Sequence, residues 1–181
     1  MINQTTAPIQ GWGTVRENET GLELTQTAPI CEGLNVVLAS CQALYLQYQK
    51  HHFVVRGREF YMLHDWFYEN VQQTQKHIHS IGERINGLGG VPVGSFAKLA
   101  ELCCFSPEPD GIFTARQMIE QDLRSEQKVI EVIRRLASQA ESLGDRATRY
   151  LYDGILLELE ERAYHNQHFL EADSLVQFPT T

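Results

Sequence analysis

Apolar residues recur along this chain at steps of three and four, the spacing that places side chains on one face of an α-helix. Four such stripes are separated by turn residues, and no alternating pattern typical of a strand pair competes with them. The stripes predict helices over about 31–55, 60–86, 114–143 and 145–171.

The boundaries of these helices carry recognisable turn and capping chemistry. The Arg-Gly-Arg triplet at 56–58 interrupts the first stripe, and the glycines and proline within 87–92 end the second. A capping box over 114–117 opens the third helix, and Asp145 is a good N-cap for the fourth. The long link between the second and third helices contains 95–105, which could form one short helix. The pattern predicts an all-α four-helix bundle whose long link permits a ferritin-type crossover.

The chain of 181 residues has room for one domain of ordinary size. Residues 1–30 are polar and interrupted by proline and glycine, so we expect an extended or partly ordered N-terminal tail. The bundle is expected over 31–172, and 173–181 is expected to be a C-terminal tail.

The charge balance is acidic, with 15 Lys plus Arg against 23 Asp plus Glu and a net charge of −8. Residues 1–30 contain one basic residue, Arg16, and no Lys or Arg follows His165. Since electrostatic binding to phosphates needs clustered positive charge, these tails are not nucleic-acid arms, and DNA binding is not expected.

The opening residues lack the basic and apolar regions of a secretory signal, and no run approaches about 18 consecutive apolar residues. We therefore expect no membrane partner. Four cysteines without an export signal indicate a reducing, cytoplasmic location, where they act as small buried hydrophobes. The adjacent pair Cys103 and Cys104 does not have the spacing of a zinc finger.

Seven histidines are the most informative residues of the chain. His52 follows Leu34 by five helical turns, so it shares the apolar stripe and is either a core residue or a ligand. His64 lies beside Leu63, near the inner face of the second helix. A lone buried histidine is more often a hydrogen-bonded core residue than a ligand, so neither position decides the matter alone.

Two further pairs have ligand spacing. His79 and Glu83 are four residues apart and could bind one metal ion together, although such pairs are more often solvated. His165 and His168 are three apart and form a possible second metal site, or simply complement a helix C-terminus. The remaining pair, His51 and His77, shows no such arrangement, and we assign both to the surface.

Taken together, these residues resemble the signature of the Dps family of mini-ferritins. The resemblance rests on a His before an aromatic and an Arg-Gly turn, then a Phe, a Leu-His, a Glu-Arg and a Gly-Gly, found at 52–57, 60, 63–64, 83–84 and 89–90. It implies a ferritin-like fold assembled into a hollow homododecamer. It also implies a ferroxidase that oxidises Fe²⁺ with hydrogen peroxide or oxygen, stores the ferric mineral and protects against oxidative stress.

The same resemblance implies an iron site shared between two subunits. His52 and His64 match the histidines of one subunit, and Glu83 matches the bridging carboxylate of the other. This chain departs from the pattern at His79 and Tyr68, where many members have aspartate. Imidazole suits Zn²⁺, Cu²⁺ and Fe²⁺, whereas ferric iron prefers carboxylates, so zinc could occupy or inhibit a site of His52, His64, His79 and Glu83.

The family's acid-lined entry pores lie near the start of the fourth helix, where this chain has Glu141 and Asp145. Asp145 serves equally well as a plain N-cap. Trp66, two residues past His64, is expected to pack beside the iron site or at an interface. Two alternatives stay open at this stage, a DNA-binding nucleoid protein of the same family and a structural helical bundle with incidental metal binding.

Overall fold

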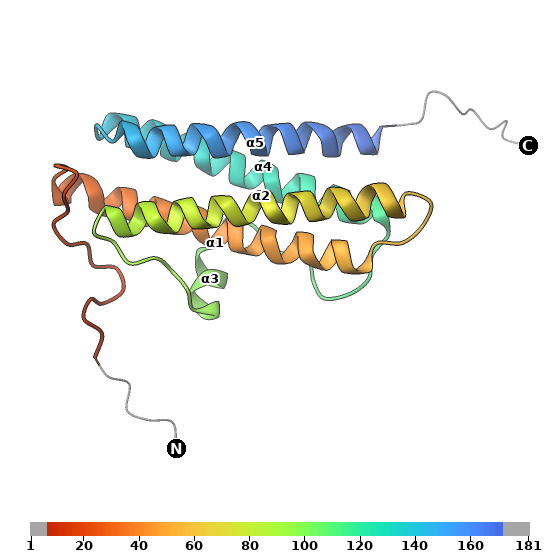
Figure 1. Cartoon of the computed structure of the whole chain (residues 1–181), viewed down its shortest axis with the longest axis horizontal. Helices are drawn as coiled ribbons and strands as arrows, with labels where there is room; N and C mark the ends of the chain where they lie inside the picture. Colours follow the sequence, from red (N-terminus) through yellow and green to blue (C-terminus); the bar gives the residue numbers. More distant parts are fainter. Residues whose placement is uncertain (1–6, 172–181) are drawn as a thin grey trace, which may run out of the picture.

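The computed structural model describes residues 7–171 and contains four long helices and one short one (Figure 1). Their bounds are α1 Leu24–Val54, α2 Phe60–Gly87, α3 Phe96–Leu102, α4 Ala115–Ser142 and α5 Arg146–Leu170. The hairpin of α1 and α2 packs on the hairpin of α4 and α5, mainly through α1 against α4. The short α3 lies outside against α1, within the link from α2 to α4. The all-α four-helix bundle with a short helix in its long link is confirmed.

Local capping explains why α4 and α5 begin where they do. The Thr114 hydroxyl accepts a hydrogen bond from the Gln117 backbone N–H at 3.2 Å. The Asp145 carboxylate accepts one from the Thr148 N–H at 2.9 Å. Gly144 joins the two helices with a φ of +79°, which glycine adopts without a steric penalty. Both predicted N-caps are therefore present.

Helix α1 begins at Leu24, earlier than the predicted Cys31, and contains Pro29. The Gln26 side chain accepts a hydrogen bond from the Glu23 N–H at 2.8 Å and donates one to the Leu143 carbonyl at 2.7 Å. Pro29 removes a single backbone donor, and packing against the end of α4 outweighs that loss. The expected boundary between 30 and 31 thus falls inside a helix.

The segment before α1 packs against the turn that follows α2. The Arg16 N–H donates to the Gly89 carbonyl at 2.9 Å, and the Gln10 side-chain amide donates to the same oxygen at 2.8 Å. A Cβ at Gly89 would collide with the Arg16 carbonyl, so this crossing requires glycine. Residues 1–6 and the expected C-terminal tail 173–181 lie outside the described residues.

The apolar stripes form one main core along the bundle and a second cluster near the α1–α2 turn. Helix α1 is central to the main core and is long and apolar enough to span a membrane, with a mean hydropathy of 1.2 over its best window. Of that window, 61% is buried inside the bundle. Its apolar composition is therefore explained by its packing against α2, α3 and α4.

The four cysteines are free thiols. Cys31 and Cys41 are buried in the main core, and Cys103 and Cys104 are half-buried at the end of α3. Burial raises the pKa of Cys41 to about 12 and that of Cys31 to about 11. Thiols with such high pKa values stay protonated near neutral pH, so these two act as small hydrophobes.

Candidate metal centre

The ends of α1 and α2 hold two stacked imidazoles. The rings of His52 and His64 have centroids 3.8 Å apart and an interplanar angle of 23°. Both side chains are half-buried, so they are reachable from outside the chain. The turn over 55–59 reverses the chain between the two helices and brings these residues together, although they are 12 positions apart.

Reciprocal hydrogen bonds fix how these rings are oriented. His52 Nδ1 lies 2.8 Å from the His64 carbonyl oxygen, and His64 Nδ1 lies 2.9 Å from the His52 carbonyl oxygen. A carbonyl can only accept, so each Nδ1 must carry a proton, and in the neutral ring Nε2 is then the nitrogen with a lone pair. Backbone carbonyls that hold the distal nitrogen are the usual orienting partners of metal-binding histidines. In this orientation, Nε2 of each ring could act as a metal ligand.

Exposed apolar side chains form an apolar collar at the α1–α2 turn, next to this pair. Phe53, Tyr61 and Met62 expose 73%, 83% and 55% of their surface. All three lie within ten residues of His52 in the sequence and flank the α1–α2 turn. Exposed apolar patches of this kind are typical of interaction surfaces.

The structure does not bring His79 and Glu83 to the stacked pair within one chain. Both are exposed on α2, and His79 follows His64 by 15 positions on the same helix, a rise of about 22 Å. Within residues 7–171, no group of three or more His, Cys, Asp or Glu could hold a metal ion. A single chain therefore supplies two halves of the predicted site at separate places.

The assignment of His51 to the surface is wrong. His51 is fully buried, with Nδ1 3.0 Å from Asp122 Oδ2 and Nε2 3.0 Å from Glu108 Oε2. It follows Tyr48 by three positions and so extends the buried stripe, whereas His52 turns toward α2. The carboxylates that make this burial favourable come from α4 and from the link before it.

His77 is also buried, contrary to its predicted surface position. Its Nε2 lies 2.7 Å from Glu158 Oε2 on α5, while its Nδ1 has no hydrogen-bond partner in the described chain. Burial lowers the pKa of His77, and the nearby Arg162 guanidinium lowers it further. His77 follows the buried Thr74 by three positions, on the face of α2 that packs toward α5.

Sequence reasoning missed a polar network at the centre of the bundle. The Arg162 Nε donates to Glu126 at 3.0 Å, and its Nη1 donates to Gln73 at 2.6 Å. The same carboxylate accepts from the Tyr48 hydroxyl and from the Asn166 amide. The available signal was the presence of acidic residues within the apolar stripe of α4, Asp122 and Glu126. Burial raises the pKa of the Glu126 carboxyl to about 7, and the Arg162 guanidinium beside it counteracts that rise.

Trp66 packs against α5 rather than beside the stacked histidines. Its indole N–H donates to Asn166 Oδ1 at 3.1 Å, and its ring meets that of His165 edge-on at 5.4 Å. The Tyr164 ring contacts both His165 and His168, at 5.3 and 4.2 Å. No third ligand joins these two histidines among the described residues, and their metal site stays a prediction.

Asp145 and Glu141, the predicted pore acids, have different environments. Asp145 is buried, and Arg84 Nη2 lies 2.6 Å from its Oδ1. Burial alone would raise the pKa of Asp145, but the Arg84 and Thr148 hydrogen bonds outweigh it and lower the pKa. With both oxygens engaged, Asp145 acts as a helix cap and ion-pair partner. Glu141 is about half exposed near Arg149, and its pore role stays a prediction.

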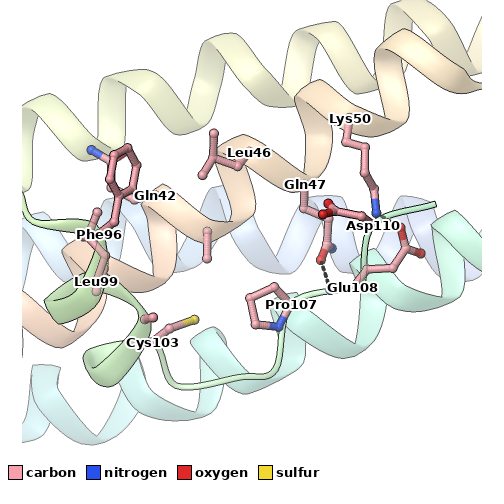
Figure 2. A pocket seen from close by; sticks show the side chains of 13 residues that line it. Gln42, Leu46, Gln47, Lys50, Phe96, Leu99, Cys103, Pro107, Glu108 and Asp110 are labelled. Atoms are coloured by element: carbon pink, nitrogen blue, oxygen red, sulfur yellow. Dashed lines mark hydrogen bonds and ion pairs between the residues drawn. The ribbon is translucent and has the colours of Figure 1, made fainter. Parts of the chain in front are cut away.

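A cavity of about 350 Å³ lies between α1, α3 and the link over 107–110 (Figure 2). Its wall is mostly apolar, and Lys50 and Glu108 form an ion pair at one end. Neither His52 nor His64 lines it. Glu108 at the wall of the cavity also contacts His51, and Gln47 donates to Asp122, the other partner of His51.

Comparison with known proteins agrees with this fold. The model of the ferritin-like domain family matches residues 31–176. The nutrient stress-induced DNA-binding protein of Nostoc is 62% identical over 92% of this chain and 91% of its own. An archaeal Dps homologue from Halobacterium salinarum has a TM-score of 0.91 at 30% identity, covering 96% of this chain and 97% of that one.

A Dps protein from Vibrio cholerae, described as a member of a broad superfamily of ferritin-like diiron-carboxylate proteins, has a TM-score of 0.82 at 25% identity. The match extends over 87% of this chain and 99% of the Vibrio cholerae chain. The chain is therefore a ferritin-like protein. Within that class it belongs to the Dps family of mini-ferritins. The name of the Nostoc relative bears against the expectation that DNA binding is absent.

Proposed function

We propose that this protein is a ferroxidase and iron-storage mini-ferritin. It oxidises Fe²⁺ with hydrogen peroxide or oxygen and keeps the ferric mineral inside a hollow homododecamer, which protects the cell against oxidative stress. The observation that carries the proposal is the stacked pair of His52 and His64, whose Nδ1 atoms are held by carbonyls while Nε2 stays free. Membership of a family related to diiron-carboxylate proteins supports iron as the substrate.

In this proposal, a second copy of the chain completes the site with His79 and Glu83. Both are exposed on α2, and about 22 Å of helix separates His79 from the His64 of the same chain. The apolar collar at the α1–α2 turn is a surface that a second subunit would cover. Assembly then brings together groups that one chain holds apart.

The donor set suits ferrous iron and zinc. Three neutral imidazoles and one carboxylate form a donor set of intermediate hardness, which binds both Fe²⁺ and Zn²⁺. Zn²⁺ has no redox chemistry, so its binding at the same ligands would inhibit iron oxidation. The carboxylate of Glu83 adds the anionic oxygen that stabilises the ferric product.

In this proposal, the residues of this chain hold the ligands in position. Each imidazole is held in one tautomer by a backbone carbonyl, so binding Fe²⁺ costs little reorganisation. Two electrons delivered to one peroxide molecule yield water and avoid release of hydroxyl radical. We place this activity in the cytoplasm, because the four free cysteines suit a reducing compartment.

DNA binding is the second candidate function, favoured by the name of the Nostoc relative. The net charge of −8 opposes it, because binding to phosphates requires an accessible cluster of bases. Exposed Arg56 and Arg58 in the α1–α2 turn are one place where positive charge is available.

The proposed function is tested by metal titration and iron oxidation in the assembled protein. We expect Co²⁺ or Zn²⁺ to bind the parent, and His64→Ala to lose most of this binding and the growth of ferric absorbance after peroxide addition. Gln75→Ala, an exposed change on the same helix, is the control and should match the parent. Equal metal binding by His64→Ala and the parent would favour a structural bundle with incidental metal binding.

A further inference from the structure

Four rings follow one another at the end of the bundle, three from α2 and one from α1. Phe60, His64 and Tyr68 are spaced by four residues and so share one face of α2. His52 contacts both His64 and Tyr68. Successive centroid distances are 5.0 Å for Phe60–His64, 3.8 Å for His64–His52 and 5.2 Å for His52–Tyr68, with interplanar angles of 29°, 23° and 33°.

Tyr68 stands at the outer end of this column. It exposes 49% of its surface in the single chain, so no other part of the described chain covers it fully. Among the described tyrosines, Tyr68 is the one whose ring contacts His52 or His64. Tyr61 contacts Phe60, and Tyr164 contacts histidines of α5. The single phenol in direct contact with a proposed iron ligand is therefore that of Tyr68.

The stacked pair is poor in negative charge. Its two imidazoles are neutral ligands, and within residues 7–171 no group of three or more His, Cys, Asp or Glu could hold a metal ion. Even with Glu83 of a second subunit, one carboxylate would face two dications, whose mutual repulsion is large away from bulk water. Peroxide will therefore often meet a site that holds one Fe²⁺, which can supply only one of the two electrons required.

We propose that Tyr68 supplies the second electron when a single Fe²⁺ reacts with hydrogen peroxide. This inference rests on the proposed ferroxidase function of the His52 and His64 site. One H₂O₂, one Fe²⁺, one Tyr68 phenol and one proton give two H₂O, one Fe³⁺ and one Tyr68 phenoxyl radical. The O–O bond breaks, Fe²⁺ and the phenol each lose one electron, and the phenol proton ends in water.

A second Fe²⁺ then restores the phenol. It passes one electron to the phenoxyl radical, which takes up one proton, and a second Fe³⁺ forms. The sum of the two steps is the oxidation of two Fe²⁺ by one peroxide, with no hydroxyl radical released. Direct contact between the Tyr68 and His52 rings gives the electron a short path from the phenol to the ligand of the iron.

The experiment uses the assembled protein, loaded without oxygen with one Fe²⁺ per subunit and mixed with one equivalent of hydrogen peroxide. Freeze-quenched samples are examined by electron paramagnetic resonance, and released hydroxyl radical is measured with a spin trap. Tyr68→Phe removes the phenol and keeps the stacked ring. Tyr61→Phe is the matched control, an exposed tyrosine on the same helix that touches neither proposed ligand.

We expect a tyrosyl radical in the parent and in Tyr61→Phe, its loss in Tyr68→Phe, and more trapped hydroxyl radical in Tyr68→Phe than in the parent. Fe²⁺ binding should be the same in all three proteins.

An unchanged radical in Tyr68→Phe, or iron oxidation in the parent without any tyrosyl radical, overturns the inference and leaves the ferroxidase function standing. A visible phenolate-to-iron charge-transfer band that Tyr68→Phe abolishes also overturns it, because Tyr68 would then be a ligand. Failure of the parent to bind Fe²⁺ rejects the ferroxidase function itself.

Discussion

His51 Nδ1 lies 3.0 Å from Asp122 Oδ2 in the interior of the bundle, and neither side chain has any exposed surface. Burial lowers the pKa of His51, but Asp122 and Glu108 outweigh burial and raise it above the usual 6.5. The folded chain therefore favours the imidazolium more than the unfolded chain does. The adjacent residue His52 is a proposed iron ligand, so this pair also fixes the end of α1 that carries the site.

The raised pKa of His51 predicts how stability changes with pH. Its contribution is fully present below about pH 6.5, the unfolded value, and is lost as pH rises through the higher folded pKa. We expect His51→Gln to reduce the alkaline fall in melting temperature. The check is thermal unfolding of parent and variant between about pH 6 and about pH 9.

His77 provides an internal contrast because its pKa is shifted the other way. Its folded pKa is lowered by burial and by Arg162, so its contribution is present above about pH 6.5 and is lost as pH falls. His77→Gln should therefore change the acid limb of the same profile and spare the alkaline limb. Parallel profiles for the two variants would contradict both assignments.

Removal of Arg162 should destabilise the bundle strongly. Arg162→Met leaves the buried carboxylate of Glu126 without its cation, which costs about 3–5 kcal/mol in such cases. The double change with Glu126→Leu should recover much of the loss, because no charge is then left unpaired. Denaturant unfolding measures both.

A surface pair is the control for this prediction. Arg134 and Glu160 lie 2.6 Å apart but are well exposed, so Arg134→Met should cost at most about 1 kcal/mol. Comparable losses for Arg162→Met and Arg134→Met would show that burial of the Arg162 pair does not matter to stability.

His79 decides whether the interface site has a third imidazole. His79→Ala should weaken Zn²⁺ or Fe²⁺ binding at least about tenfold, and His79→Asp should shift the preference toward iron. Calorimetric titration measures both variants. Gln75→Ala, one turn earlier on the exposed side of α2, serves as the control. If His79→Ala binds like the control, the site reduces to His52, His64 and Glu83.

The assembly is tested by its mass in solution. A homododecamer of 20.7 kDa chains has a mass of about 250 kDa. Native mass spectrometry or light scattering should find this species in gentle buffer. A monomer or dimer as the sole species would contradict both the shell and an iron site shared between subunits.

DNA binding should depend steeply on salt. With a net charge of −8, only local clusters of bases can contact phosphates, so we expect a retarded complex at low salt that disappears near about 0.15 M. A gel shift across a salt series measures this. A complex that persists well above that concentration would show a strong basic surface in the assembled shell.

Local features of this protein could be predicted from sequence because they are encoded within a few residues. The capping box at Thr114 and the N-cap at Asp145 lie where the residue types predict them. The helical stripes fix which faces are apolar and hence the bundle. The Dps motif marks His52 and His64, and the structure shows them stacked.

Only the tertiary structure decided whether the other histidines and several charged groups are buried or exposed. His51 is buried because Asp122, 71 positions away, lies beside it, and His77 is buried beside Glu158, 81 positions away. Asp145 is engaged by Arg84, and one helix holds His79 about 22 Å from His64. Periodicity reports which face of a helix is apolar. Whether a polar group can enter that face depends on partners from other helices, because an unpaired buried charge is too costly to keep.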